Sequence, residues 1–115
     1  MMRIEFLEAA VIDLADAVAF YNLSQENLGY EFLDEIKRTL NRIIDFPEAW
    51  PLISKRTRRC QTNRFPYGVI YKINTDVLLI VSVMHLHSEP GKWKKRLSEK
   101  KKSADGEGRG GKFER

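Results

Sequence analysis

The sequence predicts an α+β domain in which two N-terminal helices pack on a small, mostly antiparallel sheet, in the order β-α-α-β-β-β. Two observations lead to this prediction. Apolar residues recur at helical spacing through most of the first half of the chain, and the second half holds runs rich in β-branched and aromatic residues. At 115 residues, with 43% hydrophobic and 31% charged residues, the chain has the length and composition of one soluble domain.

A short strand and a helix open the chain. Residues 3–8, RIEFLE, form the predicted strand, with Ile4 and Phe6 on one face. From Glu8 the apolar spacing lengthens to that of a helix. This helix is expected to pack through one stripe of residues, which consists of Val11, Leu14, Ala15, Val18 and Tyr21.

A second helix follows a break at residues 22–29. Ser24 is its predicted N-cap, and Pro47 ends it because proline removes a helical hydrogen-bond donor. On its outer face Asp34 precedes Arg38 by four residues, which is the spacing of an ion pair. Its buried stripe is expected to consist of Leu28, Phe32, Ile36, Leu40 and Ile43.

The rest of the fold is predicted to be strands. Residues 57–62 form a short basic strand, residues 67–73 a second one, and residues 74–76 a turn. The longest apolar run, residues 77–87, is apolar on both faces, which is typical of a central strand covered on both sides. Residues 91–97 are expected to add a helical turn.

The chain is predicted to hold one folded domain, residues 1–97, and a disordered basic tail, residues 98–115. The tail carries four of the seven glycines and few residues that a core would bury. The single cysteine, Cys60, excludes a disulfide within the chain, so a reducing, cytoplasmic location is expected. No apolar run reaches the ~18–20 residues of a membrane span, and acids interrupt the apolar N-terminus, so neither a membrane partner nor a signal peptide is expected.

Charge is divided unevenly along the chain. The net charge of +4 combines −6 on residues 1–48 with +10 on residues 49–115. Such an asymmetry is expected to steer anionic partners toward the second half, whether these are nucleic acids or acidic peptides. The alternative is a solvated surface on which the bases are unevenly shared.

The second half also carries a loose family pattern. It consists of Arg64, the aromatic stretch Phe65-Pro66-Tyr67, the strand residues Val69-Ile70-Tyr71, an apolar strand to Met84, and then His85, Pro90 and Trp93. Together with the element order, this pattern resembles the RelE/ParE superfamily of bacterial toxins from type II toxin–antitoxin systems, of the plasmid stabilisation type, over residues 3–97.

The resemblance implies a compact toxin that a cognate antitoxin protein neutralises. No cofactor is expected. RelE-like members cleave mRNA in the ribosomal A site, so their partners are the ribosome and mRNA. ParE-like members poison DNA gyrase and are not nucleases. The resemblance alone does not separate these two activities.

Ribosome-dependent mRNA cleavage is the leading expectation from the residues. Cleavage through the RNA 2′-hydroxyl needs a base, an acid and cations around the phosphate. His85 and His87 suit the proton-transfer roles because the ordinary pKa of histidine lies near neutral pH, and their i,i+2 spacing places both on one side of a strand. Tyr67 is a further catalytic candidate. Ordinary strand-end packing is the alternative for the two histidines, as is core packing for Tyr67.

Three arginines are the candidate RNA or phosphate ligands: Arg58, Arg59 and Arg64. In a strand Arg58 and Arg59 face opposite ways, so only one of them can line a given cleft. Arg64 precedes the aromatic stretch where the family has an arginine, which makes it a candidate for both phosphate binding and catalysis.

One departure from the family pattern weakens the nuclease interpretation. Many relatives have two arginines two and three residues after the histidine, where this chain has His87 and Ser88. A ParE-like gyrase inhibitor, a decayed toxin or a basic nucleic-acid-binding module therefore remain alternatives. No metal is expected, because the histidine pair would need a third ligand such as Cys60 and no metal-binding motif is present.

Overall fold

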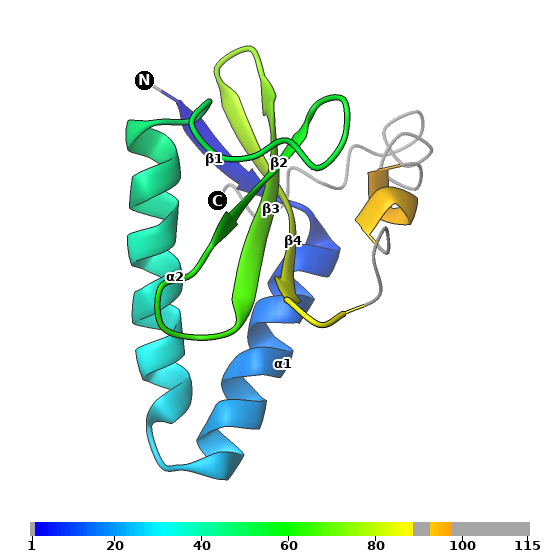
Figure 1. The fold of residues 1–115 in the computed structure, drawn as a ribbon. Helices are drawn as coiled ribbons and strands as arrows, with labels where there is room; N and C mark the ends of the chain where they lie inside the picture. The colour runs from blue at the N-terminus through cyan, green and yellow to red at the C-terminus, as the bar shows by residue number, and fades with distance from the viewer. Residues whose placement is uncertain (1, 89–92, 98–115) are drawn as a thin grey trace.

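The computed structural model describes residues 2–88 and 93–97 (Figure 1). It has the predicted element order and the predicted α+β architecture. The elements are β1 (Arg3–Phe6), α1 (Glu8–Ser24), α2 (Leu28–Asp45), β2 (Thr57–Gln61), β3 (Tyr67–Asn74) and β4 (Val77–His85). The predicted tail, residues 98–115, lies outside the described residues, as does the predicted Pro90.

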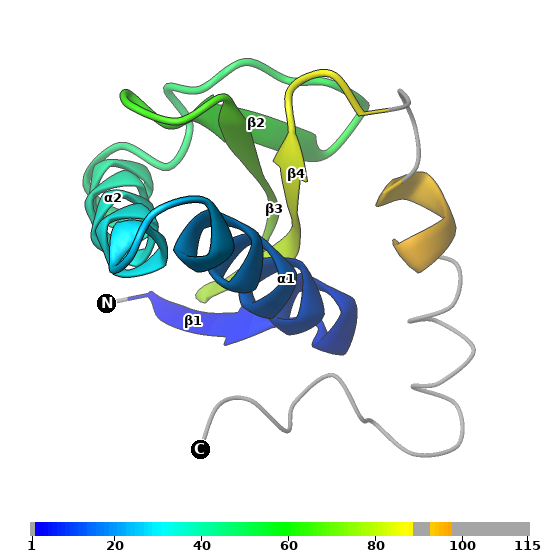
Figure 2. The same cartoon turned by 90° about the horizontal axis from the view of Figure 1, so that it is seen from below.

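The four strands form one mixed sheet in the order β1-β4-β3-β2. β1 runs parallel to β4, whereas β4 with β3 and β3 with β2 are antiparallel. The two helices form a hairpin on one face of the sheet, and the helical turn at residues 93–97 lies on the other (Figure 2). Within the described residues, no helix is long and apolar enough to cross a membrane.

Both faces of β4 are covered, as its sequence predicts. Toward the helices, a first core gathers Phe32, Ile36, Ile43, Val69, Tyr71, Leu78 and Ile80, among others. On the opposite face, a second and smaller core consists of Leu7, Ile70, Leu79, Val81 and Trp93. Trp93 is 5% exposed and belongs to the predicted helical turn, which therefore packs on the sheet.

The turn between the helices differs from the prediction. Ser24 is not the N-cap of the second helix but the last residue of α1, where its hydroxyl donates to the carbonyl of Phe20. The N-cap is Asn27, whose φ of 69° lies in the left-handed region that asparagine tolerates. The amide of Gly29, in the first turn of α2, donates instead to the side chain of Asn22 on α1. A Cβ at Gly29 would lie 2.3 Å from the Val18 carbonyl oxygen, so this close approach requires glycine.

The buried stripe of α1 also differs from the prediction. Leu14, Val18 and Tyr21 pack on the core as expected. The fully packed small residues, however, are Ala10 and Ala17, and the predicted Ala15 is exposed. The helix is apolar on most of its circumference, with Ile12, Phe20 and Leu23 exposed, so the spacing of its apolar residues does not define one face.

Tyr71 gives a prediction that depends on pH. Its side chain is fully buried and its hydroxyl donates to the carbonyl of Pro47 at 2.6 Å. Burial, the main cause, raises the pKa of Tyr71 from 10.0 to about 12. The raised pKa contributes stability that is fully present below pH ~10 and is lost as the pH rises toward ~12.

Tyr71→Phe is therefore expected to lower the free energy of unfolding by about 1 kcal/mol at pH 8, through the lost hydrogen bond. The difference in the free energy of unfolding between wild type and Tyr71→Phe should become smaller above pH 10, because there the wild-type hydroxyl ionises in the unfolded chain. Urea unfolding at pH 8, 10 and 11.5 measures this difference. A difference that stays constant over this range would contradict the buried, hydrogen-bonded hydroxyl.

Candidate functional site

The structure brings three of the predicted site residues together where β3 begins and β4 ends. Tyr67 and His85 are partners in the strand register, and their rings meet edge-on with centroids 5.2 Å apart. The His87 ring lies 5.3 Å from the His85 ring. The strand ends at His85 and not at His87 as predicted, so His87 sits in an exposed turn. The two histidines are neighbours all the same.

Hydrogen bonding and burial limit what this group can do chemically. The backbone N–H of His87 donates to Nδ1 of His85 at 3.1 Å, which places the proton of a neutral His85 on Nε2. Burial, followed by the nearby Tyr21 and Asp13, raises the pKa of Tyr67 above 10.0, so its hydroxyl stays protonated at neutral pH. Tyr67 and His85 therefore present hydrogen-bond donors, and His87 is left as the residue able to accept a proton.

His85 lies between two cavities. The first, which we call the sheet-face cleft, has a volume of about 260 Å³ and includes Arg59, Gly68, Ser88 and Lys94 in its lining. The second measures about 310 Å³ and lies between α1 and the end of β4. Its lining includes Asp13, Asp16, Phe20 and Tyr67. The first cavity is thus basic and the second contains acids.

Arg58 and Arg59 face opposite sides of the sheet, as predicted. Arg58 reaches back toward the segment before β2, where Nη1 donates to the carbonyls of Glu48 at 2.9 Å and Trp50 at 2.7 Å. This arginine therefore fixes the backbone. Arg59 lines the sheet-face cleft beside His85, so of the two it is the candidate for an anion.

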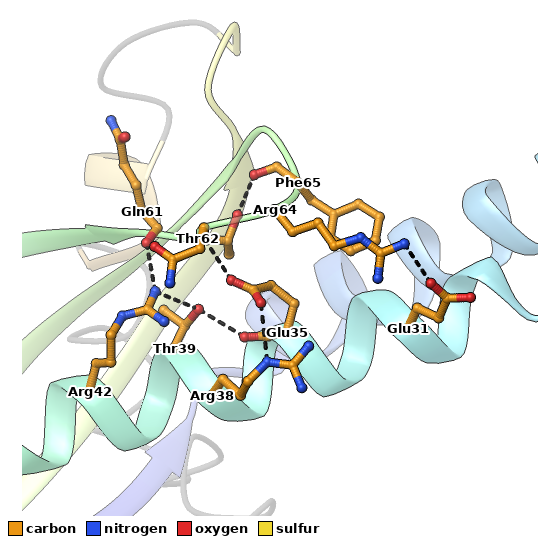
Figure 3. Close-up of polar contacts among 10 residues, drawn as sticks. Glu31, Glu35, Arg38, Thr39, Arg42, Gln61, Thr62, Arg64 and Phe65 are labelled. Atoms are coloured by element: carbon orange, nitrogen blue, oxygen red, sulfur yellow. Dashed lines mark hydrogen bonds and ion pairs between the residues drawn. The ribbon is translucent and has the colours of Figure 1, made fainter.

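Arg64 lies in the loop between β2 and β3, three residues before Tyr67, where polar contacts join α2 to this loop (Figure 3). Its Nη2 pairs with Oε1 of Glu31 at 2.5 Å, and its guanidinium lies 5.0 Å from the Phe65 ring centroid. Within residues 2–88 and 93–97, Arg64 makes no direct hydrogen bond or ring contact with either histidine. The rings of Phe65, Phe32 and Tyr67 lie between Arg64 and His85.

The same loop is held by two further residues of α2. The carboxylate of Glu35, which is buried, accepts hydrogen bonds from the backbone N–H of Asn63 and from Arg38 (Figure 3). Arg38 thus pairs with Glu35 rather than with the predicted Asp34. Arg42 donates to the carbonyl of Gln61 at 2.9 Å. These contacts, together with that of Arg64, fix the entry into β3.

The sequence did not predict the ion pair between Asp13 and Arg96, whose carboxylate accepts more hydrogen bonds than that of any other ion pair of the described residues. The Asp13 carboxylate accepts from Arg96 Nη1 at 2.6 Å and Nη2 at 2.9 Å, and also from the hydroxyl of Ser82 and the backbone N–H of Val83. β1 pairs with β4 only as far as Ile80, so Asp13 occupies the strand edge beyond that point. The sequence feature that could have indicated this ion pair is the position of Asp13, an acid within a mostly apolar helix.

Cys60 is buried in the first core, as its interpretation as a small hydrophobic residue predicts. It packs with Val69 and Phe65 rather than beside the histidines. Among the described residues, no group of three histidine, cysteine, aspartate or glutamate side chains is arranged to hold a metal ion.

Comparisons with known proteins agree with this fold. A family model described as the ParE toxin of the type II toxin–antitoxin system parDE matches residues 4–90. A structure titled "Chromosomal ParDE TA system from P. aeruginosa" superposes with a TM-score of 0.66 at 13% identity, over 74% of this chain and 96% of that one.

The isolated E. coli RelE toxin superposes with a TM-score of 0.57 at 16% identity, over 87% of this chain and 98% of that one. At these identities both structures establish the fold alone. No curated protein sequence matches. The element order and sheet are shared with both toxin structures, and the family model spans most of the chain, so the chain belongs to the ParE toxin family of type II toxin–antitoxin systems.

Proposed function

We propose that this toxin arrests growth by inhibiting DNA gyrase and not by cleaving mRNA. The observation that carries the proposal is the position of Arg64. It is the sequence candidate for both phosphate binding and catalysis, yet it pairs with Glu31 and stacks on Phe65, and among the described residues it makes no direct contact with His85 or His87. A nuclease needs its cations around the same phosphate that its base and acid serve.

The protonation of His85 supports the same proposal. Its Nδ1 accepts a hydrogen bond from the backbone, so the ring would have to give up this contact or change tautomer before it accepted a proton. Inhibition of gyrase needs no proton transfer, only a complementary surface, and the basic second half of the chain supplies one for an enzyme bound to DNA. Family membership also implies a cognate antitoxin as a partner.

Ribosome-dependent cleavage is the second candidate, because Arg59 and Lys94 line the same cleft as His85. In that mechanism Arg59 takes the phosphate role expected of Arg64, and His87 acts as the base. Tyr67 or His85 then protonates the leaving oxygen. This arrangement puts two cations near one histidine, although they differ from those of the family pattern.

The double substitution His85→Ala, His87→Ala separates the two candidates. We expect induced cells to remain growth-arrested, with an SOS response and intact messages, because neither histidine transfers a proton in gyrase inhibition. The measurement combines growth curves with mapping of mRNA 5′ ends within minutes of induction. Circular dichroism of the purified variant controls for folding.

The gyrase proposal would be wrong, and mRNA cleavage favoured, if the wild type made codon-phased cuts and a folded double variant lost both these cuts and the growth arrest. Growth that is unaffected by the wild-type chain would instead favour a decayed toxin or a nucleic-acid-binding module.

A further inference from the structure

Arg59 differs from the other half-buried arginines that the structure describes. Arg42 donates to Thr39 and Gln61, Arg58 to two backbone carbonyls, and Arg96 to Asp13. Within residues 2–88 and 93–97, Arg59 is the half-buried arginine whose guanidinium makes neither a hydrogen bond nor an ion pair with the protein. A guanidinium stays charged in any protein environment, so its five donors are directed at solvent or at a ligand.

Gly68 fixes the path of the Arg59 side chain. A Cβ built at Gly68 would lie 2.9 Å from Cδ of Arg59 and 3.0 Å from its Cγ, closer than real Cβ contacts allow. The stem of Arg59 therefore lies flat across β3, in space that only glycine leaves open. Its guanidinium then faces the sheet-face cleft, which Arg59 and Gly68 both line.

The rest of the cleft combines donors with an apolar floor. Lys94, Ser88 and His85 add hydrogen-bond donors, and among residues 2–88 and 93–97 no lining residue carries a carboxylate. The floor is made by apolar side chains, which are Ile53, Ile70, Met84, Leu86 and Trp93. A volume of about 260 Å³ holds a few side chains rather than a large cofactor.

We propose that the sheet-face cleft binds a segment of the cognate antitoxin that carries a carboxylate beside an apolar side chain. The carboxylate meets Arg59 and Lys94, and the apolar side chain packs on the floor at Met84 and Leu86. The antitoxin is the protein partner that family membership implies, and the basic half of the toxin complements an acidic segment. The proposal does not depend on which target the toxin inhibits.

The composition of the cleft favours a peptide over a nucleic acid. Single strands bind by stacking their bases on accessible aromatic rings and by contacts from several cations along the backbone. Among the described lining residues, Trp93 is only 5% exposed, and the imidazole of His85 is the other ring that could stack on a base. The rest of the floor is aliphatic apart from the thioether of Met84. Two cations, Arg59 and Lys94, match a carboxylate better than a run of phosphates.

The test selects 12-residue peptides from a random phage-displayed library on the purified full-length chain and measures their affinity by fluorescence anisotropy. We expect selected peptides to carry an acid next to a large apolar residue. Arg59→Gln should weaken them about tenfold or more through the lost charge-assisted contact. The matched controls Lys55→Gln and Arg56→Gln remove the same charge from exposed positions outside the cleft and should change affinity less than twofold.

A second arm asks whether the antitoxin occupies the cleft. The preformed complex with the cognate antitoxin should not bind the selected peptides. Peptides without acids, equal affinity for Arg59→Gln, failure to select any peptide, or undiminished peptide binding by the complex would each overturn the proposal. So would a single-stranded RNA decamer that binds through Arg59 more tightly than any peptide.

Gly68→Ala tests the positioning of Arg59 separately from the stability of the sheet. In the wild-type background it should weaken the selected peptides several-fold, because the new methyl group displaces the Arg59 stem. In an Arg59→Ala background it should change their affinity by less than twofold. An equal loss in both backgrounds would show that Gly68 does not act through Arg59.

Discussion

Asp13→Ala is expected to lower the free energy of unfolding by about 2–4 kcal/mol. This value lies toward the lower part of the range for breaking a buried ion pair, because both side chains keep some exposure to solvent. Asp13 and Arg96 are 18% and 17% exposed. Without the carboxylate, the charge of Arg96 and the N–H of Val83 both lose their partner. The melting temperature should fall by roughly 10–20 °C in a domain of this size.

Thermal and urea unfolding of the wild type, Asp13→Ala and Asp16→Ala measures this loss of stability. Asp16→Ala, three residues further along α1, is the matched control, because Asp16 is an exposed acid with no hydrogen bond or ion pair among the described residues. It should change the free energy of unfolding by less than ~0.5 kcal/mol. If Asp13→Ala were as stable as Asp16→Ala, the ion pair would not hold residues 93–97 on the sheet.

Phe32→Ala is expected to have a still larger effect on stability. The Phe32 ring is fully buried and meets three other rings, with centroid distances of 5.4 Å to Tyr21, 5.2 Å to Phe65 and 4.9 Å to Tyr67. Removing such a side chain costs about 3–5 kcal/mol, from lost burial and from the cavity left behind. Since Tyr67 contacts His85, the same cavity should also loosen the aromatic side of the candidate site.

Denaturant unfolding of Phe32→Ala measures this loss, and Tyr30→Ala is its control. Tyr30 is an aromatic residue of the same helix that is 58% exposed, so its removal should cost less than ~0.5 kcal/mol. A Phe32→Ala protein that lost less than 1 kcal/mol would contradict the packed aromatic cluster beneath the site.

Local periodicity explains why the order of elements was predictable. The stripe of α2 and the β-branched, apolar runs of β3 and β4 each follow from one segment of sequence, and they carry apolar residues on the faces that the structure buries. The packing face of α1 was not predictable in the same way, since Ile12, Phe20 and Leu23 are as apolar as the residues that it buries.

The candidate site was predictable only where neighbours in sequence decide it. The i,i+2 spacing placed the histidines together, and alternation separated Arg58 from Arg59. The partners of Arg64 and Arg96 lie 33 and 83 residues away in the chain, on helices whose placement the sequence does not show. The sequence therefore indicated a phosphate ligand at Arg64, whereas the structure pairs this residue with Glu31 and gives Arg59 no hydrogen bond or ion pair among the described residues.

Inhibition of purified DNA gyrase tests the central claim most directly. The full-length chain is added to gyrase, ATP and relaxed plasmid, and the supercoiled product is measured on a gel beside the His85→Ala, His87→Ala variant. We expect both proteins to block supercoiling at similar concentrations. Undisturbed supercoiling by gyrase at concentrations where the same preparation cuts mRNA on translating ribosomes would contradict the claim.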